Sequence, residues 1–150
     1  MKRWLFLILT FPALAACSAD YPLKAYFKAG KLYFDGDGKD WFFGKTGFCP
    51  SYLKVWTETG DIVWQIETDN GPVDCKIFPV AYGSLPKGWK AIVAAKPLQS
   101  GELYVIKGDG GDAYHGAFRY REQRLLSVEN QPEVARRFVD TEENVNMLLD

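Results

Sequence analysis

The sequence of 150 residues holds one histidine and three cysteines, and its charges nearly cancel, with 18 basic and 19 acidic side chains. One histidine cannot supply a metal site that depends on several imidazoles. A net charge of −1 lacks the basic footprint with which proteins bind nucleic acid. The chain also lacks a Walker loop, a dinucleotide fingerprint, a Cys-x-x-Cys pair and a Gly-x-Ser-x-Gly elbow. We therefore expect no nucleic-acid partner, no cofactor and no metal.

Length and composition predict one folded domain. Apolar side chains make up 47% of the sequence and aromatic side chains 15%, which is too hydrophobic for a disordered chain. A chain of this length can also bury a substantial core.

The N-terminus has the pattern of a secretory signal peptide. Lys2 and Arg3 are followed by residues 4–16, which carry no charge and are almost wholly apolar. Thirteen residues rise only about 20 Å as a helix, whereas a bilayer core is roughly 30 Å thick. The segment therefore predicts a cleaved signal peptide over residues 1–16 rather than a membrane span. A buried N-terminal helix is the alternative.

The end of this leader, Leu14-Ala15-Ala16-Cys17, resembles the lipobox of bacterial lipoproteins. The resemblance implies cleavage between Ala16 and Cys17 and a diacylglyceryl thioether on Cys17, because the chemistry needs a thiolate nucleophile. Several acyl chains on one residue would anchor the protein stably to a membrane. Ordinary signal cleavage, leaving Cys17 as a free thiol, is the alternative.

The same resemblance carries an expectation about location. In lipoproteins of Gram-negative bacteria an Asp after the lipidated Cys is the usual inner-membrane retention signal, and this chain has Ser18 there. The resemblance thus implies an outer-membrane lipoprotein of the cell envelope that faces the periplasm. We expect residues 17–21 to form its tether.

Cleavage would leave 134 residues with two further cysteines, Cys49 and Cys75. Removing Lys2 and Arg3 leaves 16 basic and 19 acidic residues, a net charge of −3. Two thiols remaining in an exported chain predict one disulfide between Cys49 and Cys75. Two buried free thiols are the alternative.

Residues 22–121 form an aromatic body that contains all 14 glycines of the chain. Short runs of alternating apolar residues are separated by turn signals, such as Thr59-Gly60, a pattern typical of an all-β domain. The predicted strands are 24–29, 31–35, 52–58, 61–68, 75–82, 89–96, 102–107 and 113–121.

The segment Leu98-Gln99-Ser100-Gly101-Glu102-Leu103-Tyr104 resembles the L-x-x-G-x-x-Y signature of fibronectin type III and related immunoglobulin-like domains. The resemblance implies a tyrosine corner, in which Tyr104 buries its ring and its hydroxyl bonds to upstream backbone. It favours an immunoglobulin-like β-sandwich of about 7–8 strands, with a small barrel as the alternative. Cys49 and Cys75 are too close in sequence for the usual immunoglobulin bridge.

Residues 122–150 differ from the body in having few aromatics and many charged residues. Asn130 and Pro132 offer a helix start. Apolar residues then follow at helical spacing, which predicts an amphipathic C-terminal helical extension. The alternatives are a partner-binding helix and partial disorder. The positions of this helical face are Val134, Phe138, Thr141, Val145 and Leu148, with Leu149 beside them.

Two acidic, glycine-rich segments superficially suggest a metal site. Asp35–Asp40 resembles the start of a calcium loop, but Lys39 stands where an oxygen ligand should be, so we interpret the segment as a turn. Asp109–Asp112 is likewise interpreted as a hairpin turn. The lone imidazole, His115, is expected to point outward from its strand, without a catalytic role.

Exposed loop aromatics are the remaining candidates for a binding site. Trp41, Phe42, Phe43 and Trp89 lie in or beside loops rich in Gly, Asp and Pro, where they would contact a ligand or else plug the ends of the domain. We expect a non-catalytic, lipid-anchored protein that binds an envelope protein or glycan. The alternatives are a carboxylate-based hydrolase of envelope glycans and a purely structural lipoprotein.

Overall fold

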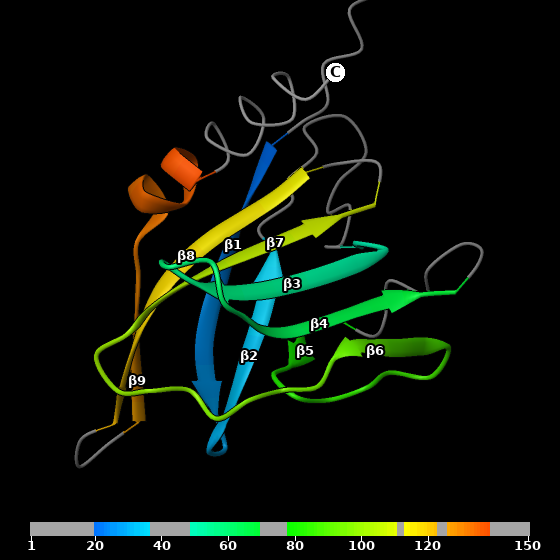
Figure 1. Ribbon diagram of the computed structural model, residues 1–150, viewed down its shortest axis with the longest axis horizontal. Coiled ribbons are helices and arrows are strands. Elements are labelled where there is room, and N and C mark those ends of the chain that lie inside the picture. The colour runs from blue at the N-terminus through cyan, green and yellow to red at the C-terminus, as the bar shows by residue number, and fades with distance from the viewer. Residues whose placement is uncertain (1–19, 37–48, 70–77, 111–112, 123–125, 139–150) are drawn as a thin grey trace, which may run out of the picture.

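A computed structural model describes residues 20–36, 49–69, 78–110, 113–122 and 126–138. The described part is built from nine strands and a short helix over 132–138 (Figure 1). The strands are β1 (Asp20–Lys28), β2 (Lys31–Gly36), β3 (Tyr52–Thr57), β4 (Ile62–Thr68), β5 (Val80–Ala81), β6 (Trp89–Val93), β7 (Leu103–Asp109), β8 (Ala113–Glu122) and β9 (Leu126–Asn130).

The nine strands form one sheet in the order β5-β2-β1-β8-β7-β3-β4-β6, with β9 paired to β8. All neighbours are antiparallel except β1 and β8, which are parallel. The all-β prediction is therefore confirmed. Among the described strands, however, there is a single curled sheet, and the two facing sheets of an immunoglobulin-like sandwich are not seen (Figure 1).

Aromatic side chains fill the inside of the curl. The Phe34 ring on β2 lies 6.0 Å from that of Trp64 on β4 and 5.7 Å from that of Phe118 on β8, measured between centroids. Four other strands lie between β2 and β4 in the strand order, so their rings meet only because the sheet bends round on itself. Phe34, Trp64 and Phe118 are all fully buried. Burying such large side chains is the main driving force for closing the curl.

β1 and β8 cross closely at Gly116. Asp20 to Pro22 pair with Ala113 to His115, after which β1 leaves β8. A Cβ at Gly116 would lie 2.5 Å from the carbonyl oxygen of Leu23 and 2.8 Å from its Cβ. Glycine is therefore required at residue 116 for the two backbones to approach.

The start of β1 corrects the predicted tether. Residues 17–21 were expected to be a flexible link, but Asp20 and Tyr21 belong to β1 and pair with β8. The prediction failed because this pairing joins segments about 93 residues apart, which local sequence patterns do not report.

The C-terminal extension is only partly helical. Leu126–Asn130 is a strand of the sheet, not part of a helix, because it pairs with the free side of β8. The helix begins at Pro132, as its start signals indicate, and the N–H groups of Val134 and Ala135 donate to the Gln131 carbonyl. Ala135 is buried against β7 and β8. The predicted apolar positions from residue 141 onward lie outside the described residues.

Candidate functional site

The tyrosine corner predicted from the sequence is present. The Tyr104 side chain on β7 is only 1% exposed, and its hydroxyl oxygen accepts a hydrogen bond from the Gln99 N–H at 2.7 Å. Burial raises the pKa of Tyr104, so its hydroxyl stays protonated at neutral pH. The bond fixes the chain at Gln99, just before β7. A tyrosine corner thus occurs here on a single curled sheet.

A second tyrosine, Tyr82, holds the same segment three residues earlier. Its hydroxyl donates to the Lys96 carbonyl oxygen at 2.6 Å and lies 3.2 Å from the Val63 carbonyl oxygen. The Lys96 N–H in turn donates to the Val63 carbonyl at 2.9 Å. Burial is the main cause that raises the pKa of Tyr82 to about 12. The segment from Lys96 to Gln99 is therefore attached to the sheet at both ends, although it belongs to no strand.

The turn between β3 and β4 faces this segment. The Asp61 N–H donates to the Thr57 hydroxyl oxygen at 3.0 Å, and the hydroxyls of Thr57 and Thr59 are 2.9 Å apart. The Thr59 hydroxyl also donates to the Asp61 carboxylate at 3.4 Å. Gly60 has a φ of +94°, a conformation that glycine adopts without strain. These contacts give the turn a defined shape with hydroxyl and carboxylate groups at its surface.

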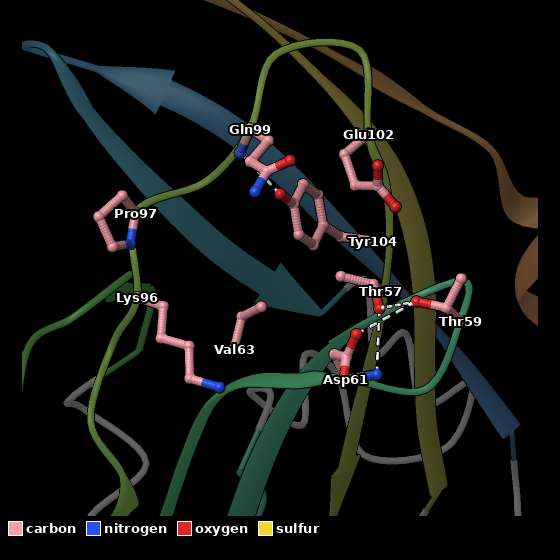
Figure 2. A pocket seen from close by; sticks show the side chains of 9 residues that line it. All are labelled: Thr57, Thr59, Asp61, Val63, Lys96, Pro97, Gln99, Glu102 and Tyr104. Carbon is pink, nitrogen blue, oxygen red and sulfur yellow. Dashed lines mark hydrogen bonds between the residues drawn. The ribbon is translucent and has the colours of Figure 1, made fainter.

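Between the turn and the fixed segment lies a cavity of about 700 Å³ (Figure 2). Val63 and the buried Tyr104 lie at its base. Both walls carry polar groups that Figure 2 shows on opposite sides. The turn contributes Thr57, Thr59 and Asp61, the fixed segment contributes Lys96, Pro97 and Gln99, and Glu102 lies just before β7.

The cavity carries charges of both signs. Asp61 supplies a carboxylate from the turn, Glu102 a carboxylate from the start of β7, and Lys96 an ammonium group. Asp61 and Lys96 are exposed, and Glu102 is half-buried. Hydroxyl, carboxylate, amide and ammonium groups around an apolar base suit a polar organic ligand that presents several hydrogen-bonding groups.

The loop aromatics predicted as ligand contacts do not form this cavity. Trp41, Phe42 and Phe43 lie outside the described residues. The prediction of Trp89 as a ligand contact was wrong. Trp89 begins β6 and is only 8% exposed, and its ring centroid lies 6.1 Å from that of Phe78. Its predicted alternative, filling the end of the domain, fits this buried position.

His115 also differs from its prediction. It was expected to point outward, yet it is only 7% exposed. The helix packs on the face of β8 that carries it, the start of β1 lies beside it in the sheet, and Tyr21, Pro22, Ala135 and Arg136 share a pocket of about 100 Å³ with it. Because other elements pack around this part of β8, the side chain of His115 does not reach solvent freely.

Of the three cysteines, only Cys49 lies within the described residues. Cys49 is disulfide-bonded. Its predicted partner, Cys75, lies outside the described residues, so the pairing stays a prediction. Cleavage after Ala16 and lipidation of Cys17 concern residues that also lie outside them.

The two acidic segments lie only partly within the described residues, because residues 37–40 and 111–112 are outside them. No group of three His, Cys, Asp or Glu side chains in the described part of the chain is placed to hold a metal ion. Asp35 lies in β2, where its carboxylate accepts the Gly36 N–H at 2.9 Å, and Asp109 ends β7. No helix in the described segments is long and apolar enough to cross a membrane.

No family model, curated protein or solved structure matches this chain. The site is therefore interpreted from its own geometry. The motif that ends at Tyr104 was predicted from the sequence as a mark of the fold, and the Thr59-Gly60 turn as a connection between strands, but neither was predicted to line a site. Lys96 joins the site through the hydroxyl of Tyr82, which no sequence pattern indicated.

Proposed function

We propose that this chain is a lipid-anchored protein of the bacterial cell envelope that binds a saccharide of the envelope glycan in the cavity between Asp61 and Glu102. The leader and the lipobox resemblance at Cys17 support the anchor. The cavity supports the binding role. The role is non-catalytic, as expected from the sequence.

The observation that carries the proposal is that the cavity is built in advance. The hydroxyls of Tyr82 and Tyr104 hold the Lys96–Gln99 segment in place, and hydrogen bonds among Thr57, Thr59 and Asp61 shape the turn. A site that is already ordered loses little conformational entropy when its ligand binds. Such preorganisation is typical of binding sites rather than of surface irregularities.

The chemistry of the walls favours a saccharide. A sugar ring offers hydroxyls on its edge and C–H groups on its faces, so it needs polar partners beside an apolar surface. The carboxylates of Asp61 and Glu102 accept hydrogen bonds from sugar hydroxyls, and charge-assisted bonds of this kind are about twice as strong as neutral ones. Val63 and Pro97 offer the apolar contact. The volume of about 700 Å³ lies within the range of small-ligand sites.

The proposal is tested by calorimetric titration of the detergent-solubilised, lipidated protein with defined oligosaccharide fragments of the cell-wall glycan. We expect the variants Asp61→Asn and Glu102→Gln each to weaken binding about tenfold. Glu133→Gln, which removes an exposed carboxylate on the helix, is the matched control and should bind normally. Absence of binding by the unaltered protein would leave the purely structural lipoprotein as the better reading.

A carboxylate-based hydrolase is the second candidate, because Asp61 and Glu102 line the same cavity. Pairs of carboxylates on either side of a glycosidic bond are the usual catalytic groups of glycosidases. Mass spectrometry of the same fragments after incubation separates the two functions. Intact fragments support binding, whereas cleavage that is lost in Glu102→Gln would establish hydrolysis.

The anchor has its own test. The intact mass of the protein purified from membranes should show cleavage before Cys17 and an acyl mass on that residue. A mature protein without the acyl mass would contradict the lipid anchor but not the binding site.

A further inference from the structure

The start of β1 lies close to the proposed anchor point. Asp20, the first residue of β1, follows Cys17 by three residues. Three residues of fully extended chain span at most about 11 Å. A lipid on Cys17 would therefore hold the start of β1 within that distance of the membrane surface, without the long flexible linker that would let the domain turn freely.

The cavity lies at the other end of the same strands. Asp20 pairs with Ala113 at the start of β8, whereas Tyr104 of the cavity pairs with Phe118. Five residues along a strand correspond to about 17 Å. The β3–β4 turn extends beyond this row, because Thr57 is the residue paired with Tyr104 and the turn follows it. In Figure 1 the blue start of β1 lies at the top of the view, and the turn after β3 lies below it and to its left.

Charge favours the same orientation. The helix over 132–138 lies beside the start of β1, since Tyr21 and Pro22 share a pocket with Arg136, and Arg136 is exposed. The helix also carries exposed Arg137 and Glu133, whereas the cavity carries Asp61 and Glu102 against Lys96, so the helix end has the more positive balance of charge. An anionic membrane surface attracts the end with the more positive balance of charge.

From this register we infer that the cavity is directed away from the membrane that carries the anchor and receives its ligand from the aqueous compartment. The inference rests on the proposed lipid anchor and deepens the proposed function. It assigns the ligand to water-exposed saccharide and excludes the lipids of the anchoring membrane. The short link between Cys17 and β1 makes this orientation a property of the chain.

The orientation is tested with the lipidated protein in vesicles of phosphatidylethanolamine and phosphatidylglycerol. A fluorophore is attached through Gln99→Cys at the cavity or through Glu133→Cys on the helix. Both positions are exposed, and labelling without reductant preserves the disulfide at Cys49. Lipids that carry a quencher on the headgroup are then added. We expect a marked loss of fluorescence at residue 133 and little loss at residue 99.

The outcomes separate this inference from the function on which it rests. Equal quenching at both positions, or stronger quenching at residue 99, in protein with the acyl mass on Cys17 overturns the orientation alone. Absence of the acyl mass overturns the anchor and the orientation together. The saccharide titration of the solubilised protein tests the binding role independently, because it needs no membrane.

Discussion

The side chain of Asn130 pairs with the backbone of Ala25 as a neighbouring strand would. Its Oδ1 accepts the Ala25 N–H and its Nδ2 donates to the Ala25 carbonyl oxygen, both at 2.8 Å. The pairing occurs where β1 has left β8 and β9 has taken its place beside β8. One amide side chain thus satisfies two backbone groups where the strand pairing changes.

We expect Asn130→Ala to lower the free energy of unfolding by about 1–3 kcal/mol, because it leaves the N–H and C=O of Ala25 without these partners. Urea denaturation measures the change. Glu129→Ala is the control: it removes an exposed ion pair with Arg121 at 3.3 Å and should cost less than about 1 kcal/mol. Equal effects of the two substitutions would show that the amide pairing contributes nothing.

The crossing of β1 and β8 gives a second prediction. Gly116→Ala should destabilise the protein by about 3 kcal/mol, because the added Cβ would meet the Leu23 backbone, which cannot move as a side chain can. Gly101→Ala is the matched control, since its φ is +90° but no atom lies within 4 Å of the added Cβ. Gly101→Ala should lower the free energy of unfolding by about 1–2 kcal/mol, because of the backbone conformation alone. Similar thermal shifts for both variants would contradict a close approach at Gly116.

The strands of the body were predictable because their side chains alternate within a few residues. Ile62, Trp64 and Ile66 were placed on one face from their spacing, and Trp64 and Ile66 are fully buried. Leu126 and Val128 show the same alternation, but the run is short and lies in a polar segment. This run forms a strand because it pairs with β8, and its local sequence alone does not indicate a strand.

The parts that sequence reasoning missed depend on contacts between distant segments. His115 is buried because β1 and the helix cover it, and both lie far from it in sequence. The tyrosine corner at Tyr104 and the turn after β3 were predictable as local features, because the hydrogen bond of Tyr104 spans only five residues and the turn joins consecutive strands. Their meeting in one cavity was not, because Lys96 is held there by Tyr82, 14 residues away.

Removal of the Tyr104 hydroxyl should loosen the cavity. Tyr104→Phe leaves the Gln99 N–H without its acceptor, so we expect a loss of about 1 kcal/mol in stability. The affinity for the saccharide should fall as well, because the free wall would then have to be ordered on binding. Tyr26→Phe, on β1 beside Tyr33 and outside the cavity lining, is the control and should bind normally. Unchanged affinity in Tyr104→Phe would mean that this wall does not contact the ligand.

The disulfide at Cys49 should contribute strongly to stability. The double variant Cys49→Ala, Cys75→Ala should lose about 3–4 kcal/mol, since the predicted bridge closes a loop of about 27 residues. Urea denaturation of the double variant and of the oxidised protein measures this loss. Titration of thiols in the unfolded, unreduced protein provides the check. Two reactive thiols besides Cys17 would contradict the bridge.

The pH dependence of stability should report the burial of Tyr82. Its pKa is raised from 10.0 to about 12 in the folded protein, so the unfolded state loses this proton first as the pH rises. The stabilising effect of the neutral hydroxyl is complete below about pH 10 and is lost between pH 10 and about 12. The variant Tyr82→Phe has no hydroxyl at residue 82, so its stability does not fall for this reason between pH 10 and about 12. The variant should be less stable than the unaltered protein by about 1 kcal/mol at pH 8, because the bond to Lys96 is gone. The gap should then narrow above pH 10. Urea midpoints measured from pH 8 to 12 test this, and parallel profiles of the two proteins would contradict it.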